Sequence, residues 1–113
     1  MNPAGADGED RAARHLEQAG LRVVARNFRS RFGEIDLIAR DRDTLVFVEV
    51  RARSRADFGG AAESITAAKR ERLRMTAQIY LSRLPDLPPC RFDVVLLSGP
   101  DLATIEWLVA AWE

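Results

Sequence analysis

Residues 33–38 read GEIDLI and residues 46–51 read VFVEVR, and these two segments decide how the rest of the chain is interpreted. Both are short, apolar and rich in β-branched residues, which is typical of buried strands. Residues 41–44 read DRDT, a composition that favours a turn. The sequence therefore predicts a hairpin whose strands cover about residues 33–40 and 45–52.

The register of this hairpin brings two acidic side chains face to face. If Arg40 pairs with Leu45 across the turn, Asp36 lies opposite Glu49. Like charges facing each other across a ladder are destabilising. At a separation of about 5 Å and an effective dielectric constant of about 20, the repulsion is about 3 kcal/mol. A divalent metal ion between the two carboxylates would explain why the chain keeps them.

In this register four charged side chains form one patch on a single face of the hairpin: Glu34, Asp36, Glu49 and Arg51. The carboxylates would hold Mg²⁺ through hard oxygen ligands, and the arginine would hold the scissile phosphate or orient the water. The alternative is a solvated sheet face with cross-strand ion pairs. Asp93 lies in another apolar run, and for it we expect a structural role as the partner of an arginine.

The remaining segments predict a mixed α/β fold with the element order α-β-β-β-α-β-β. Asp7 is a candidate N-cap for the first helix, and Gly20 is expected to end it. The other expected elements are a strand over 21–26, a basic turn over 27–32, a helix over 61–83, a strand over 92–97, and a strand or short helix from 104.

Length and composition indicate one globular domain over residues 7–113, preceded by a loose tail over 1–6. A single cysteine excludes a disulfide framework, and a single histidine excludes a multi-histidine zinc site within one chain. The chain has no run of about 18 apolar residues and no signal peptide, so we expect no membrane association. These features predict a cytoplasmic protein.

Positive charge is concentrated in two parts of a chain whose formal net charge is zero. Eleven arginines and six acidic residues lie between Arg11 and Arg55, and five bases and one acid lie between Lys69 and Arg83. This asymmetry suits a polyanion such as DNA, although the dominance of arginine over lysine also fits a bias in codon usage. The predicted nucleic-acid-binding residues are Arg29, Arg31, Arg53, Lys69 and Arg72.

The motifs together resemble those of a known family. An acid on one strand followed by E-x-K on the next is the metal-site pattern of the PD-(D/E)xK nuclease superfamily. Over nearly its full length the chain is similar to the YraN-like family of small bacterial endonuclease-like proteins. The segments that carry this resemblance are GE at 8–9, NFR at 27–29, GEIDLI, VFVEVR, FG at 58–59, Lys69 with its helix, and RFDVV at 91–95.

The resemblance implies a restriction-endonuclease-like core, a mixed β-sheet flanked by helices, which is also shared with archaeal Holliday junction resolvases. It implies that Asp36 and Glu49 bind Mg²⁺ or Mn²⁺ and that Glu9 completes the metal site. The predicted catalytic residues are Asp36, Glu49 and Arg51. Arg51 stands where the motif usually has lysine, and because arginine stays protonated it can stabilise a phosphate but cannot act as a general base.

The leading functional hypothesis is therefore a metal-dependent endonuclease that hydrolyses phosphodiester bonds in DNA, with branched or flapped DNA as a candidate substrate. One alternative is a non-catalytic nucleic-acid-binding module that keeps the nuclease fold. Another is a protein-interaction adaptor that uses the acidic C-terminal segment and its tryptophans. Related resolvases act in pairs, so a homodimer is also considered.

Overall fold

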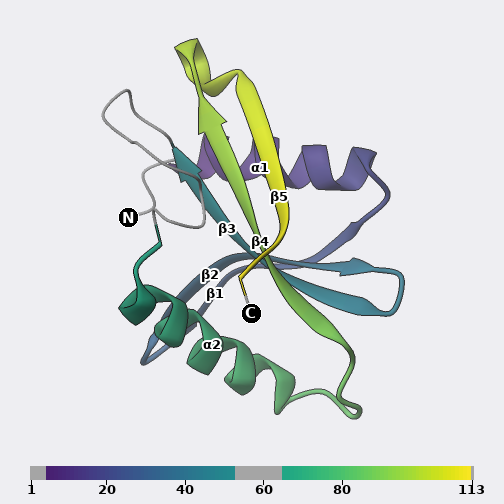
Figure 1. Cartoon of the computed structure of the whole chain (residues 1–113). Helices are drawn as coiled ribbons and strands as arrows, with labels where there is room; N and C mark the ends of the chain where they lie inside the picture. Colours follow the sequence, from purple (N-terminus) through teal and green to yellow (C-terminus); the bar gives the residue numbers. More distant parts are fainter. Residues whose placement is uncertain (1–4, 53–64, 113) are drawn as a thin grey trace.

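The structure is a computed structural model, and it describes residues 5–52 and 65–112. Five strands and two α-helices follow one another in the predicted order, with one short 3₁₀ helix before the last strand (Figure 1). The elements are α1 (Gly5–Gln18), β1 (Arg22–Ser30), β2 (Gly33–Asp41), β3 (Thr44–Ala52), α2 (Ala67–Leu81), β4 (Cys90–Ser98), η1 (Pro100–Leu102) and β5 (Thr104–Trp112).

The five strands form one mixed sheet in the order β1-β2-β3-β4-β5. Neighbouring strands are antiparallel except for β3 and β4, which are parallel and are joined through α2. The β2–β3 hairpin has the predicted register from the Arg40–Leu45 pair to the Leu37–Val48 pair. The ladder ends there, so the predicted pairing of Asp36 with Glu49 is wrong. The sheet twists strongly, so that the β1–β2 hairpin crosses the direction of β4 and β5 in Figure 1.

The two helices cover opposite faces of the sheet and create two cores. On one face α1 buries a group of small and branched side chains: Ala12, Ala13, Leu16, Leu37, Ala39, Val46, Val48 and Val50. On the other face α2 covers a second group: Ile35, Ile38, Leu45, Phe47, Leu73, Ala77, Val94 and Leu96. Successive β3 residues alternate between the two cores, as the period of a strand buried on both faces requires.

The first helix ends as predicted but begins earlier. It starts at Gly5, so Asp7 lies in its first turn and is not the N-cap that the sequence predicted. An acidic side chain in the first turn still favours the helix dipole. Gly20 has a φ of +101° and ends the helix, as expected.

Three further boundaries differ from those expected. β1 continues through residues 27–30, which the sequence had suggested as a turn, because these residues pair with β2. Helix α2 begins at Ala67 rather than near 61, because Thr66 caps it by accepting a hydrogen bond from the backbone N–H of Lys69. The segment from Thr104 is a strand, which resolves the alternative of a short helix.

No helix in residues 5–52 and 65–112 combines the length and apolar character that crossing a membrane requires.

Candidate metal centre

Three carboxylates from two elements meet beside the β2–β3 hairpin. Glu9 comes from α1, and Glu34 and Asp36 come from β2, with one oxygen of each lying within 4.8 Å of the others. Glu9 is 5% exposed and Asp36 is 4% exposed. The structure therefore brings together two of the three predicted metal ligands and adds Glu34 to them.

Asp36 owes its position to a change in the hairpin ladder. The backbone pairs of β2 and β3 extend only to Leu37 and Val48. Beyond this point the backbone N–H of Val50 donates to Oδ2 of Asp36 over 2.8 Å. A side chain thus replaces a main-chain acceptor, and the bond fixes the Asp36 carboxylate against β3.

Glu49, the third predicted ligand, is buried but lies outside this group of three carboxylates. Its Oε2 is 3.0 Å from Nζ of Lys69, which comes from the first turn of α2. That oxygen accepts no hydrogen bond of acceptable geometry from any part of the chain that the structure describes. The metal-binding roles of Glu9, Asp36 and Glu49 remain predictions.

The last predicted catalytic residue, Arg51, lies near the end of β3 beside Leu96 of β4 and is partly buried. Its predicted role as a phosphate clamp stays a prediction. Arg53, which we expected to bind nucleic acid, lies outside the described residues.

The donor set of the acid cluster suits a hard divalent cation. All its oxygens are carboxylate oxygens, which Mg²⁺ and Mn²⁺ prefer. Three such groups within 4.8 Å of one another repel strongly unless a positive charge or protons compensate them. A cation bound by Glu9, Glu34 and Asp36 would relieve this repulsion, so the residues present fit the metal that the motif implies.

A basic surface adjoins the acid cluster at the β1–β2 turn. Helix α2 packs against this turn, because Oγ of Ser30 lies 2.8 Å from Oγ1 of Thr76. Three predicted nucleic-acid-binding residues lie around the contact: Arg29 and Arg31 at the turn, and Arg72 on α2. A Cβ added at Gly33 would lie 3.8 Å from Cβ of Arg72. We call Arg29, Arg31 and Arg72 the basic seam.

The basic seam is exposed and directly connected to the acid cluster. All three arginines are exposed, and Nε of Arg29 lies 3.3 Å from Oε2 of Glu34. The fourth predicted residue, Lys69, lies three residues before Arg72 on α2, where it contacts Glu49. Arg29 therefore contacts the acid cluster at the β1–β2 turn, and Lys69 contacts the neighbouring Glu49 from α2.

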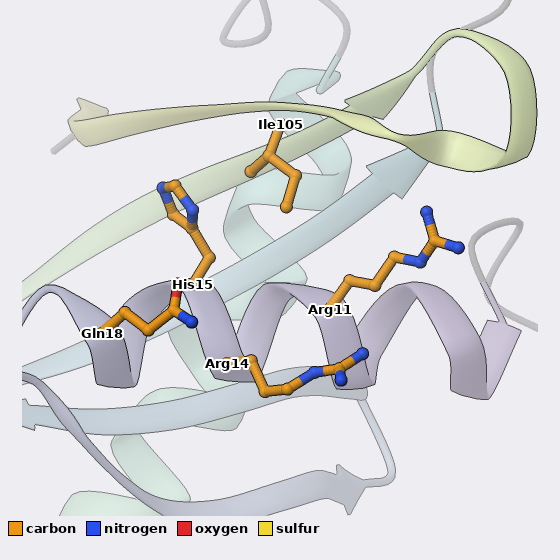
Figure 2. Close-up of a pocket in the computed structure, with 5 residues that line it drawn as sticks. All are labelled: Arg11, Arg14, His15, Gln18 and Ile105. Carbon is orange, nitrogen blue, oxygen red and sulfur yellow. The ribbon is translucent and has the colours of Figure 1, made fainter.

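A second cationic surface was not predicted from the sequence. A hollow of about 230 Å³ between α1 and β5 is lined by Arg11, Arg14, His15, Gln18 and Ile105 (Figure 2). The four α1 residues recur at the spacing of one helical face, which is the signal that could have identified them. One of them is already engaged, because Arg11 donates a hydrogen bond to the backbone carbonyl of Asp101.

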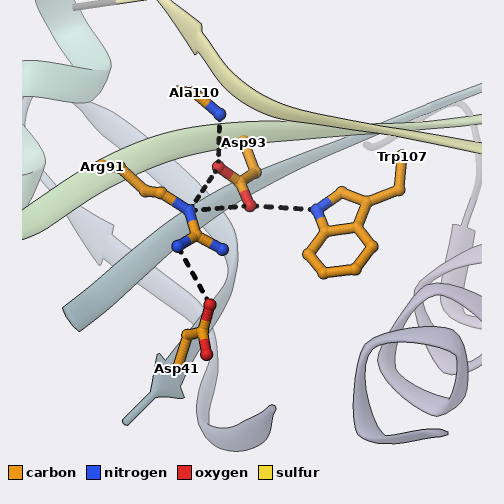
Figure 3. A network of polar contacts seen from close by, with 5 residues as sticks. All are labelled: Asp41, Arg91, Asp93, Trp107 and Ala110. Atoms are coloured by element: carbon orange, nitrogen blue, oxygen red, sulfur yellow. Dashed lines mark hydrogen bonds and ion pairs between the residues drawn. The ribbon is translucent and has the colours of Figure 1, made fainter. Parts of the chain in front are cut away.

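Asp93 has the structural role that the sequence predicted. Its carboxylate is fully buried and accepts hydrogen bonds from Nε of Arg91, Nε1 of Trp107 and the backbone N–H of Ala110 (Figure 3). Arg91 also reaches Asp41 at the end of β2 over 3.0 Å. Burial lowers the pKa of Arg91, but the hydrogen bonds and charges of the two aspartates outweigh this and raise it overall. The network joins β2, β4 and β5, and both carboxylate oxygens of Asp93 accept hydrogen bonds within it.

The fold and the site define a small mixed α/β protein with a carboxylate cluster on its sheet. The chain belongs to the uncharacterised protein family UPF0102, whose model matches residues 8–97. A UPF0102 protein of Dechloromonas aromatica is 62% identical over 108 residues, which cover 96% of this chain and 87% of the relative. A UPF0102 protein of Methylobacillus flagellatus is 54% identical and covers 99% of this chain and 98% of the relative.

Proposed function

We propose that this protein is a metal-dependent endonuclease that hydrolyses phosphodiester bonds in DNA. The observation that carries the proposal is the cluster of Glu9, Glu34 and Asp36, in which two nearly buried carboxylates and a third lie within 4.8 Å beside an exposed basic seam. Carboxylates that can hold a divalent cation, next to arginines that can hold phosphates, are the two parts that such a reaction requires.

In this proposal Glu9, Glu34 and Asp36 hold Mg²⁺ or Mn²⁺, and Glu49 contributes from β3. When bound, the metal lowers the pKa of water and stabilises negative charge on the phosphoryl group. The Val50 N–H keeps the Asp36 carboxylate in place. The guanidinium of Arg51 holds the phosphate, because its planar set of N–H donors matches the phosphate oxygens.

The basic seam binds the DNA backbone. Arg29, Arg31 and Arg72 are exposed, so their guanidinium groups can reach phosphates without losing buried contacts. Such contacts position the nucleic acid but do not read its sequence. The substrate is therefore expected to be selected by shape, and branched or flapped DNA is the form we propose to test first.

The test compares cleavage by the wild-type protein with that by Asp36→Asn and Glu49→Gln. Single-stranded, duplex, flapped and four-way DNA are incubated with Mg²⁺ or Mn²⁺, and metal affinity is measured by calorimetry. Both variants should lose cleavage by at least about 100-fold, and Asp36→Asn should also bind metal more weakly. Asp43→Asn, in the exposed β2–β3 turn, is the matched control and should cleave normally.

Unchanged cleavage in both variants would contradict the proposal. Arg51 in place of the usual lysine favours one other function, a nucleic-acid-binding module without turnover. In that case the wild-type protein would bind DNA in a salt-dependent way and cleave none of the four substrates. Cutting both sides of a four-way junction would further require a homodimer, which light scattering with and without junction DNA would detect.

A further inference from the structure

Lys69 is the only lysine of the chain, and the structure places it beside a buried carboxylate of the candidate site. Its backbone N–H donates to Oγ1 of Thr66 over 3.1 Å, so the N-cap of α2 fixes the backbone position from which the Lys69 side chain extends. Its Nζ lies 3.0 Å from Oε2 of Glu49. The other basic residues of α2 are arginines.

The two partners of this ion pair differ in exposure. The Glu49 side chain is 6% exposed, and a buried carboxylate is costly unless a positive charge or hydrogen bonds compensate it. The Lys69 side chain is 39% exposed and reaches the carboxylate from the solvent side. A half-exposed ammonium on a flexible stem is a partner that can leave at low cost.

The carboxylate of Glu49 in this pair lies outside the acid cluster. Asp36 is bonded to the N–H of Val50, which is the residue next to Glu49 on β3. Glu49 therefore directly precedes the residue that holds Asp36, but its carboxylate is directed to α2 and is not part of the acid cluster. Lys69 is the described group that compensates its charge there.

We propose that Lys69 is a positioning residue that holds Glu49 in the metal-free protein and releases it when a divalent cation binds. This inference rests on the proposed function, because it takes Glu9, Glu34 and Asp36 as the metal site. Glu49 then exchanges one cation for another, and its burial stays compensated in both states. Metal affinity is consequently lowered by the Lys69–Glu49 pair, which the metal must break.

Calorimetric titration with Mn²⁺ tests this exchange in a double-mutant cycle. Lys69→Gln should bind Mn²⁺ about tenfold more tightly than the wild type. The same change in a Glu49→Gln protein should alter the dissociation constant by less than about twofold, because the pair is already absent. Lys69→Arg should bind no more tightly than the wild type, since arginine keeps the charge and bonds a carboxylate in two places.

Arg72→Gln is the matched control, because it removes one positive charge from the same helix three residues away. An equal gain in affinity in this control, or in Lys69→Gln on the Glu49→Gln background, would show a general charge effect and overturn the inference. Unchanged or weaker binding by Lys69→Gln would also overturn it. Circular dichroism in EDTA confirms that each variant is folded.

A direct observation of Lys69 separates this inference from the proposed function. Reductive ¹³C-methylation keeps the charge of the amine and labels one lysine, with a separate signal from the N-terminus. Mg²⁺ should shift the Lys69 signal of the wild type, and the shift should be absent in Glu49→Gln. Metal binding without this shift would overturn the role of Lys69 and leave the metal site standing. Absence of any metal binding would overturn both.

Discussion

At the scale of single residues, two buried carboxylates on adjacent strands differ in the number and kind of their polar partners. Asp93 on β4 accepts hydrogen bonds from a guanidinium, an indole and a backbone amide, so it is fully committed to holding the sheet together. Glu49 on β3 has one half-exposed lysine as its compensating charge among the described residues. Burial alone therefore does not identify a functional acid, and the number and exposure of its partners distinguish the two cases.

Replacing Asp93 should destabilise the fold. Asp93→Asn keeps the size of the side chain but leaves Arg91 without its buried counter-ion. It also places an amide NH₂ group, which is itself a donor, next to the three groups that donate to Asp93. The free energy of unfolding should fall by about 3 kcal/mol, measured by urea denaturation. Asp43→Asn, in the exposed turn, should change it by less than about 0.5 kcal/mol. Equal losses in the two variants would show that the network contributes nothing specific.

The same network makes a prediction about pH. The pKa of Arg91 is raised in the folded protein, so its contribution to stability is complete below the pKa of an unfolded arginine and is lost only above it. The difference in unfolding free energy between the wild type and Asp93→Asn should therefore stay constant between about pH 6 and about pH 9. A difference that decreases steadily across this range would mean that another group titrates with the network.

At the scale of elements, the end of α1 shows why a glycine is required at one position. The N–H of Gly20 donates to the carbonyl of Glu17, and the N–H of Leu21 donates to that of Leu16, which is the pattern of a Schellman motif. This motif needs a positive φ at Gly20, and the observed value is +101°. Leu16 and Leu21 are both buried in the core on the α1 side, so the motif also directs the chain into β1.

Gly20→Ala should therefore cost about 1 kcal/mol of unfolding free energy, although nothing lies within 4 Å of the added Cβ. Gln18→Ala is the control, because this exposed last residue of α1 does not have a positive φ, and the change should alter the free energy of unfolding by less than about 0.5 kcal/mol. Thermal or urea unfolding of both variants measures the difference. An equal loss in Gln18→Ala would contradict the assignment of strain to Gly20.

The sequence predicted the elements better than it predicted their ends. The β2–β3 register could be predicted because a short turn and two alternating patterns specify it locally. The extension of β1 could not be predicted, since Phe28 is held in the strand by Ile35 of β2 and by the ring of Tyr80, 5.1 Å away. Contacts between elements overrode the turn-like composition of this segment.

The candidate site was predictable to a similar extent. Asp36 could be identified from one strand, because an acid within an apolar run is visible locally. Glu9 could be identified only through the family resemblance, since its approach to β2 depends on the packing of α1. The partner of Glu49 was not predictable, because it depends on how far α2 extends over β3, and no local pattern specifies this position.

At the scale of the whole molecule, the two ends of the β1–β2 hairpin differ in what surrounds their arginines. The turn end carries Arg29 and Arg31 beside α2 and the acid cluster. The opposite end carries Arg22 and Arg40, which pair across the two strands, and Arg42 in the following turn. With Arg72 of α2 the basic seam contains three arginines, as many as the group at the opposite end, so the two sets allow the effect of position to be separated from that of net charge.

The basic seam should dominate the affinity for DNA. In EDTA, the triple change of Arg29, Arg31 and Arg72 to Gln should weaken binding to a fluorescent duplex, measured by anisotropy. The slope of log affinity against log salt should fall by up to about 3, because each lost phosphate contact releases about one counter-ion fewer. The same triple change at Arg22, Arg40 and Arg42 should leave the slope nearly unchanged. Equal losses in both proteins would mean that net charge, and not the basic seam, attracts DNA. Absence of DNA binding by the wild type at low salt would favour a protein-interaction adaptor.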